Sequence, residues 1–255
     1  NEANNILATS VSGSTTHWLK NTLDYKMGLM IVIGGTIGTV LGIFTFTYFK
    51  DIGKIDTVIF DFGGVLIDWN PAYVFLKEFR GDTKKMSHFL EHICSWEWNE
   101  NQDAGYSLAQ ATEERVAMFP EHEKLIRMYY GRWEEMLGYE HTETVEILKH
   151  LKEKGEHKLL GLTNWSHETF PVALERFNFL SWFDGIVVSG TEKMKKPDAR
   201  IYQLTLNRYN ITADNAIFID DKKENVDAAV NEGIHGIYFR SALGLKKELE
   251  HFGVL

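Results

Sequence analysis

The chain has 255 residues, of which 44% are hydrophobic and 13% aromatic, so it can bury a sizeable core and hold one large or two modest domains. The net charge of −9 argues against nucleic-acid binding, which needs a basic face, but does not exclude a small anionic substrate held by a local lysine. The single cysteine, Cys94, cannot form an intramolecular disulfide, so we expect a buried thiol in a reducing compartment.

Residues 1–54 differ in composition from the rest of the chain. Residues 27–49 carry no charged side chain, and Gly34, Gly38 and Gly42 recur at every fourth position, as on the packing faces of membrane helices. We therefore predict a transmembrane helix at 27–49, with a buried soluble helix as the alternative. Lysines on both flanks leave the orientation of such a helix open.

Residues 5–50 resemble part of a sulfite-exporter type of membrane permease. The resemblance is carried by a threonine- and serine-rich stretch and an Asp-containing turn before the glycine-rich span, in LATSVSGSTTHWLKNTLDYKMGLMIVIGGTIGTVLGIF. Because such a permease needs several spans, transport by this chain alone is not expected. The chain begins at Asn1, which fits a fusion or a truncated or misassembled reading frame. We expect a cytoplasmic catalytic domain, with membrane tethering through residues 27–49 left open.

The stretch IDTVIFDFGGVLIDWN, residues 55–70, predicts a buried strand at 55–60 that stops at Asp61. Parallel sheets collect ligand chemistry at the carboxyl ends of their strands, and Gly63 and Gly64 leave room for an anion beside the carboxylate. The alternative is that Asp61 caps a turn for which the glycines supply unusual backbone angles.

Residues 71–138 contain helix signals and no strand signal, so we predict a separate helical bundle there. Pro71 opens a helix to about residue 80, Ser107 and Gln110 form a capping box for a helix to about 118, and Pro120 opens one through about 137. Most aromatic residues in this segment are expected in the bundle core. An inter-helix loop that could face a substrate is predicted to contain Trp96, Trp98, Asn99 and Asp103. Of these, Trp98 is the candidate substrate contact.

From residue 142 onward, helices alternate with short apolar strands. The pattern predicts strands at 158–162, 186–188, 216–219 and 236–239, with helices at 143–154, 171–177 and 198–209, one ending at 233 and one reaching about 249. Such alternation indicates a doubly wound parallel sheet, an α/β fold with a Rossmann-like core formed by residues 55–70 and 139–255.

Reactive side chains follow four of these strands: Asp61, Thr163 with Asn164, Lys196, and Asp220 with Asp221. The residue types suit a phosphate and a hard cation. A carboxylate can attack phosphorus if a cation offsets its charge, and Mg2+ between carboxylates would do so. Lys196 would add a fixed positive charge, and the Thr163 hydroxyl can bind phosphate oxygens.

The motifs Asp61-Phe62-Gly63-Gly64-Val65-Leu66, Leu162-Thr163-Asn164, Lys196-Pro197-Asp198 and Phe218-Ile219-Asp220-Asp221 resemble, in order and spacing, those of the haloacid dehalogenase superfamily. The segments TEKMKKPDARIY and FIDDKKENVDAA look similar to phosphatases of the alpha-glucose-1-phosphate phosphatase type, and residues 71–138 match the position of a helical cap. The resemblance implies Asp61 as nucleophile and metal ligand, a Gly63 backbone carbonyl and Asp221 as Mg2+ ligands with Asp220 beside them, and Thr163, Asn164 and Lys196 around the phosphate.

Gly63 departs from the resemblance, because most phosphatases of the superfamily carry an acid-base aspartate at this position. Asp68, His167 or a residue of the helical segment would have to replace it. The leading expectation is a Mg2+-dependent phosphatase acting on a small phosphorylated metabolite, with a sugar phosphate as one candidate. The alternatives are a metal-free 2-haloacid dehalogenase that uses Asp61, and a catalytically weak phosphate-binding module. The oligomeric state is left open.

Overall fold

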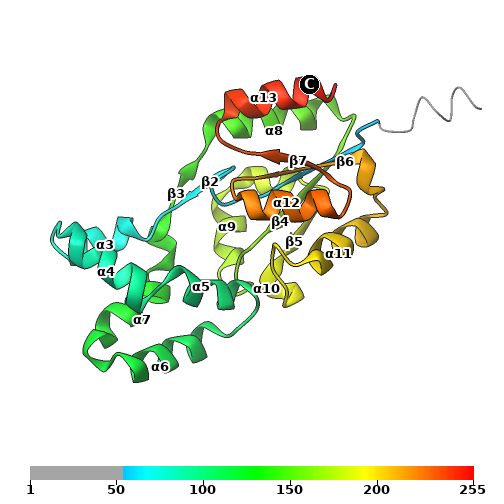
Figure 1. The fold of residues 1–255 in the computed structure, drawn as a ribbon. Coiled ribbons are helices and arrows are strands. Elements are labelled where there is room, and N and C mark those ends of the chain that lie inside the picture. Colours follow the sequence, from blue (N-terminus) through cyan, green and yellow to red (C-terminus); the bar gives the residue numbers. More distant parts are fainter. Residues whose placement is uncertain (1–53) are drawn as a thin grey trace, which may run out of the picture. The chain divides into compact units, whose positions relative to one another are not determined.

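The computed structural model describes residues 54–255, and its centre is a five-stranded parallel sheet (Figure 1). The strand order is β5 (Gly185–Val188), β4 (Lys158–Thr163), β1 (Thr57–Phe60), β6 (Ala216–Asp220) and β7 (His235–Tyr238). Phe60 pairs with Gly161 on one side and with Ile219 on the other. The predicted α/β class with a parallel sheet is therefore confirmed.

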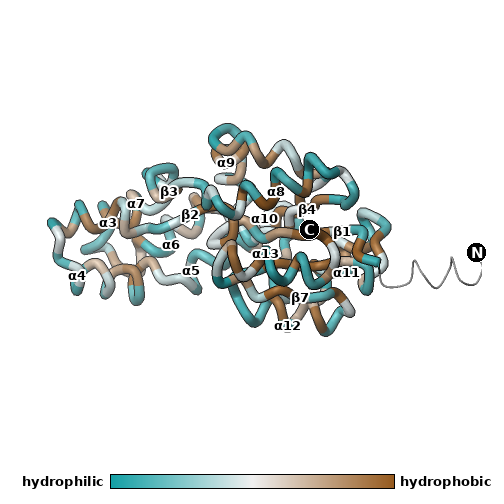
Figure 2. The backbone as a smooth tube through the Cα atoms, turned by 90° about the horizontal axis from the view of Figure 1, so that it is seen from above, coloured by the Kyte–Doolittle hydropathy of each residue, from teal (hydrophilic) through white to brown (hydrophobic). Residues whose placement is uncertain are grey.

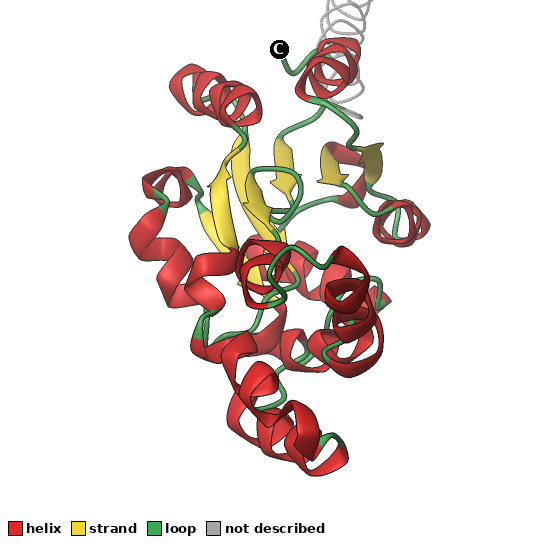
Figure 3. Cartoon of the chain, turned by 90° about the vertical axis from the view of Figure 1, so that its left-hand side faces the viewer, coloured by secondary structure: helices red, strands yellow, loops and turns green. Residues whose placement is uncertain are grey.

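Helices cover both faces of this sheet, as Figure 3 shows from the side. On one face, α8 (Thr142–Lys154) and α13 (Ala242–His251) pack with Val58 and Phe60; on the other, α11 (Ala199–Tyr209) and α12 (Lys223–Asn231) pack with Ile59. Side chains alternate between the faces of a strand, so a sheet covered on both sides needs continuous apolar strands, and β1 is buried throughout. Two further helices, α9 (Phe170–Arg176) and α10 (Ser189–Glu192), and the short turns η4 (Asn178–Trp182) and η5 (Ala213–Asn215) complete this region.

A helical insertion, residues 72–136, lies between the two antiparallel strands β2 (Ile67–Trp69) and β3 (Leu137–Glu140). Figure 2 shows it extending to one side of the sheet region, with α3 and α4 at the far end. Phe75, Phe89 and Tyr129 form its aromatic centre, with the first two ring centroids 5.0 Å apart. Its elements are α3 (Ala72–Glu78), α4 (Thr83–His88), a π-helical turn η1 (Phe89–Ile93), α5 (Trp96–Asp103), α6 (Leu108–Met118), η2 (Pro120–His122), α7 (Glu123–Gly131) and η3 (Trp133–Met136).

Polar side chains cap the starts of two helices, and a glycine ends a third. The Asn70 side chain accepts a hydrogen bond from the Ala72 amide, and the Ser107 hydroxyl accepts one from the Gln110 amide. Gly155 ends α8 in the left-handed conformation, with φ 65°. Cys94 is buried, and burial raises the pKa of its thiol to about 12, in keeping with the expected apolar role.

Two expectations for the insertion were wrong. Residues 96–103 form the helix α5 rather than a loop, because Ser95 caps its first turn by accepting from the Trp98 amide. The helix predicted from Pro120 to about 137 is divided into η2, α7 and η3, and residues 137–140 form the strand β3. That strand pairs with β2, so the chain returns to the sheet beside its point of departure.

The predicted transmembrane helix at 27–49 and the permease-like segment lie outside the described residues. Within residues 54–255, none of the helices combines the length and the apolar character needed to cross a bilayer.

Candidate active site

The strand ends of the sheet bring four predicted residues together. Asp61 follows β1 directly, and its backbone amide donates to the Ile219 carbonyl of the neighbouring β6. Thr163 ends β4, and Asp220 ends β6 on the opposite side of β1. Lys196 follows β5 and α10 in the chain. The central position of β1 therefore places Asp61 between the side chains that its two neighbours present.

Lys196 joins this cluster. Its ammonium group is fully buried and lies 2.9 Å from Asp61 Oδ1 and 2.7 Å from Asp220 Oδ2. It also donates to the Leu162 carbonyl at 2.9 Å. A buried lysine that bridges two carboxylates is fixed in one geometry, because loss of either partner would leave an uncompensated charge. Lys196 is therefore a buried residue of the candidate site and not a solvated surface lysine.

Asn164 fixes the backbone that carries this lysine. Its side-chain amide donates to the Lys196 carbonyl at 2.9 Å, and its side-chain oxygen accepts from the Lys196 amide at 2.8 Å. Such a reciprocal pair holds the loop after β5 against the end of β4. Asn164 also lines a cavity described below, so a positioning role and a substrate contact are both compatible with its place.

Asp220 accepts hydrogen bonds from more donors than Asp61 or Asp221 does. Besides Lys196, it accepts from the Lys222 amide at 2.7 Å and from the Asn225 side chain at 3.0 and 3.1 Å. Asn225 was not singled out from the sequence, since an asparagine inside a helical pattern carries no distinctive signal. Asp220 is thus an anchor for Lys196, and Asp61 and Asp221 retain more oxygen capacity for another ligand.

The oxygens of Asp61, Asp220 and Asp221 come within 4.8 Å of one another, close enough to share one metal ion. Three ionised carboxylates and one ammonium group leave a local charge of about −2. Carboxylate oxygens are the ligands of hard cations, so this donor set fits Mg2+. Asp61 and Asp221 are the candidate ligands.

Burial and mutual repulsion shift the protonation of these groups. Burial raises the pKa of Asp61 to about 7, although Lys196 opposes the shift. Burial and then the charge of Asp220 raise the pKa of Asp221. Burial alone would lower the pKa of Lys196, but the charges of Asp220 and Asp61 outweigh it and raise that pKa, so this side chain stays an ammonium. A cation bound here would favour the ionised forms of Asp61 and Asp221.

The two glycines after Asp61 have different surroundings. Gly64 has φ +76°, and a β-carbon there would collide with the carboxylate of Asp221. Gly63 has open space where its β-carbon would be, and it lines the neighbouring cavity. Gly64 is therefore required by both conformation and close approach, whereas the structure places no steric demand for glycine at position 63.

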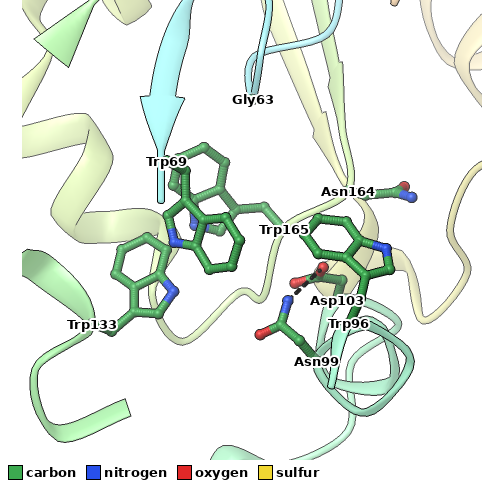
Figure 4. A pocket seen from close by; sticks show the side chains of 8 residues that line it. All are labelled: Gly63, Trp69, Trp96, Asn99, Asp103, Trp133, Asn164 and Trp165. Atoms are coloured by element: carbon green, nitrogen blue, oxygen red, sulfur yellow. Dashed lines mark hydrogen bonds between the residues drawn. The ribbon is translucent and has the colours of Figure 1, made fainter. Parts of the chain in front are cut away.

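A cavity of about 80 Å³ opens beside this cluster (Figure 4). Its walls come from the end of β1, from β2, from α5 and η3 of the helical insertion, and from the loop after β4. The lining residues are Gly63, Trp69, Trp96, Asn99, Asp103, Trp133, Asn164 and Trp165. Four of the eight lining residues are tryptophans, and among the described residues the buried N–H groups of Trp69 and Trp165 have no hydrogen-bond partner.

The helix α5 is fastened to the core loops that carry the site. Glu100 lies 2.6 Å from the Lys195 ammonium and 3.5 Å from that of Lys222, whose charge sits 4.1 Å from the centre of the Trp96 ring. Lys195 precedes Lys196, and Lys222 follows Asp221. Glu100 thus links the helical insertion to two loops of the sheet region, next to the charged cluster.

Trp98 is not where the sequence placed it. Its ring packs against Tyr129 and Tyr130, at centroid distances of 5.3 and 5.2 Å, in the core of the insertion. Because α5 is a helix, side chains two positions apart point in different directions, so Trp96 and not Trp98 reaches the cavity. Trp69 and Trp165 also line it and were not singled out from the sequence.

The candidates for the acid that is absent at Gly63 differ in whether they line the cavity. His167 is exposed, and the Asp68 carboxylate accepts a hydrogen bond from the Tyr73 hydroxyl; neither lines the cavity. Asp103 does line it. The candidate from the helical segment is the one that reaches the site.

Comparisons with known proteins agree with this geometry. Residues 58–239 match the sequence profile of the family described as haloacid dehalogenase-like hydrolase. The chain is similar to a sesquiterpene phosphatase from Aspergillus oryzae, with 29% identity over 203 residues that cover 75% of this chain and 93% of the relative. It is also similar to a phosphorylated carbohydrates phosphatase from Thermotoga maritima, with 26% identity over 185 residues that cover 72% of this chain and 84% of the relative.

A solved structure of an HAD-family enzyme from Bacteroides thetaiotaomicron, in complex with magnesium and inorganic phosphate, has a similar fold. The TM-score is 0.55 at 19% identity, and the alignment covers 73% of this chain and 94% of that chain. At this identity the similarity concerns the fold.

Proposed function

This chain belongs to the haloacid dehalogenase-like hydrolase family, and we propose that it is a Mg2+-dependent phosphatase that hydrolyses a small phosphorylated metabolite through an aspartyl-phosphate on Asp61. The observation that carries the proposal is the buried ammonium of Lys196, held between Asp61 and Asp220 with Asp221 close by. This arrangement suits a phosphate dianion next to a carboxylate nucleophile, because it supplies positive charge where both are negative.

Each residue has a defined part in the proposed reaction. Asp61 attacks phosphorus, the bond from phosphorus to the leaving oxygen breaks, and water later hydrolyses the aspartyl-phosphate. Lys196 holds Asp61 and faces the phosphate, and Thr163 offers its hydroxyl at the end of β4. Asp61, Asp221 and the Gly63 carbonyl would hold Mg2+, with Asp220 as the anchor of Lys196. When bound, the ion neutralises charge and orients the phosphate.

The cavity lining bears on the kind of substrate. The cavity is lined by indole rings, two of which have unpaired N–H groups, and by the side chains of Asn99, Asn164 and Asp103. Such a lining suits a leaving group that has a flat apolar face and a few acceptor oxygens. The relatives are a sesquiterpene phosphatase and a phosphorylated carbohydrates phosphatase, and both kinds of leaving group are compatible with such walls. A sugar phosphate, including the alpha-glucose-1-phosphate type, is one candidate, and an apolar alcohol phosphate is another. The helical insertion would act as a lid that excludes water.

Phosphatase activity is tested on the purified chain with a panel of phosphate esters, with and without Mg2+. We expect turnover that requires the ion, and a fall of about 1,000-fold or more in Asp61→Asn, because removing a nucleophile removes the covalent route. Asp227→Asn, which changes an exposed carboxylate paired with Lys223, is the matched control and should keep wild-type activity. Equal activity in Asp61→Asn and wild type would reject the nucleophile.

The absence of an acid at position 63 favours one competing reaction, 2-haloacid dehalogenation, in which Asp61 attacks carbon and no leaving alcohol needs a proton. Against it stands the carboxylate cluster, whose adjacent charges are costly without a cation. Chloride release from 2-haloacids in the presence of a chelator would reverse the ranking. Binding of phosphate without turnover of any ester would indicate a binding module instead.

A further inference from the structure

Hydrolysis of an alkyl phosphate requires a proton for the leaving oxygen, and Gly63 has no side chain to give one. Of the eight described residues that line the cavity, Asp103 alone has an ionisable side chain. We propose that Asp103, reaching into the cavity from α5 of the helical insertion, is the general acid and base of this enzyme. This inference rests on the phosphatase function proposed above.

The position of Asp103 is fixed by the helix that carries it and by the core. The Ser189 hydroxyl, at the end of β5, donates to the Asp103 backbone carbonyl, and the Asp103 carboxylate lies in reach of the Ser166 amide. Figure 4 shows the carboxylate beside Trp96 and joined to the Asn99 amide, whose nitrogen is 3.2 Å from Asp103 Oδ2. The side chain is thus held at the junction between insertion and sheet, where a leaving group would lie.

Asn99 is itself held in place from a neighbouring helix. The Tyr130 hydroxyl of α7 donates to the Asn99 side-chain oxygen at 3.0 Å, which directs the amide nitrogen of Asn99 toward Asp103. The chain Tyr130–Asn99–Asp103 therefore orients the carboxyl group through its Oδ2 atom.

Asp103 is also in the protonation range that such a role needs. Burial, and then the charge of Glu100 on the same helix, raise the pKa of Asp103 to about 7, while Lys222, Lys195 and the Ser166 amide oppose the shift. A group with a pKa near the working pH is present in both forms, and so can give a proton in one half-reaction and take one in the other.

Two further ionisable groups, Tyr129 and Tyr130, approach Asp103 from α7. Burial, together with smaller contributions that include the charge of Asp103, raises both tyrosine pKa values far above neutrality. They therefore stay neutral across the working range. The lysines and Glu100 remain as the charges that set the Asp103 equilibrium.

An alcohol phosphate is hydrolysed in two half-reactions. Asp61 forms a bond to phosphorus, the bond to the leaving oxygen breaks with its electron pair, and the Asp103 carboxyl proton moves to that oxygen to give the alcohol. The Asp103 carboxylate then takes a proton from water as the water oxygen attacks phosphorus. The bond from phosphorus to Asp61 breaks, phosphate leaves, and Asp103 is protonated again.

The test compares two aromatic esters that differ in leaving group, 2-phenylethyl phosphate and 4-nitrophenyl phosphate, with Mg2+ present. We expect Asp103→Asn to lower kcat/KM, which reports the steps through departure of the leaving group and not the later attack of water, about 100-fold for the first ester and less than about 3-fold for the second, whose phenolate leaves almost without protonation. Glu97→Gln, which removes an exposed carboxylate from the same helix, should change neither rate. Retained turnover of the nitrophenyl ester also reports that the variant is folded.

The wild-type enzyme gives a second readout that needs no variant. Since Asp103 must be protonated to act as the acid, kcat/KM for 2-phenylethyl phosphate should fall as the pH rises above about 7, and kcat/KM for the nitrophenyl ester should not. Equal losses of kcat/KM on both esters in Asp103→Asn, no loss on either, or the same pH limb of kcat/KM for both esters would overturn the assignment. A wild-type enzyme that turns over neither ester with Mg2+ would instead overturn the phosphatase function, and this role with it.

Discussion

At the scale of single residues, Gly63 and Gly64 show how neighbouring positions of one type have different reasons to be glycine. Gly64 supports the approach of Asp221 and has a positive φ, so its hydrogen is needed in place of a side chain. Gly63 has free space, and its lack of a side chain bears on chemistry rather than on packing.

We expect Gly64→Ala to lose at least about 1 kcal/mol of stability, because an alanine is strained at this φ and its methyl group must displace the Asp221 carboxylate. The same displacement separates the candidate metal ligands, so Mg2+-dependent turnover should fall about 10-fold or more. Thermal unfolding and steady-state kinetics measure the two effects.

Gly63→Ala is the matched control, since its methyl group meets no atom within 4 Å. We expect its unfolding free energy to stay within about 0.5 kcal/mol of wild type. Equal losses in both variants would show that the closeness of Gly64 to Asp221 does not decide the effect.

The residues that sequence reasoning predicted best are those that follow strands. Asp61, Thr163, Lys196 and Asp220 come together because parallel strands deliver their ends to one edge, which a strand pattern is enough to foresee. Trp98 was misplaced because the choice between neighbouring side chains depends on helix phase, and that phase cannot be known for a segment read as a loop.

At the scale of elements, α5 explains most of what the sequence did not reveal. Apart from its tryptophans, its residues are polar or charged, so no apolar stripe at helical spacing marks it as a helix. Its stability comes from the Ser95 cap and from contacts with the core that are distant in sequence. The strands β2 and β3 were missed for a similar reason, because they are only partly buried and their polar residues interrupt any apolar run.

Glu100 is the contact by which α5 holds the sheet region. Burial alone would raise its pKa, but hydrogen bonds from Lys195 and Trp96 lower it below its ordinary value, so the carboxylate is ionised at neutral pH. We expect Glu100→Gln to weaken this attachment by about 1 kcal/mol, which speeds amide hydrogen exchange in α5 about 5-fold. Because α5 carries Asp103 and Trp96, kcat/KM should also fall.

Exchange measured by mass spectrometry on wild type, Glu100→Gln and the exposed-site variant Glu97→Gln separates the ion pairs from a general loss of charge on the helix. High salt should reduce the difference between wild type and Glu100→Gln, since the pairs are only partly buried. If Glu97→Gln speeds exchange in α5 as much as Glu100→Gln does, the two lysines are not what holds the helix.

At the scale of the whole molecule, the carboxyl ends of the strands hold three neighbouring carboxylates, two of which are paired with the buried Lys196. A folded chain keeps such a cluster at a cost to its own stability, since repulsion and burial both disfavour the charged forms. The apolar strands that made the fold predictable also create this low-dielectric edge. The stability of the fold therefore depends on the charges of the site. A sequence pattern does not give the size of this electrostatic cost.

Because the carboxylates repel one another without a cation, Asp221→Asn should have opposite effects on Tm with and without Mg2+. In a chelator, Asp221→Asn should unfold at a higher temperature than wild type, because it removes one of the repelling charges. With the ion at about 100 times its Kd, wild type should gain about 3 kcal/mol, or several degrees in Tm, and Asp221→Asn much less. The order of the two proteins should then reverse. Asp227→Asn, an exposed carboxylate on α12, should follow wild type in both conditions, and a constant order of Tm values would contradict a metal site at these strand ends.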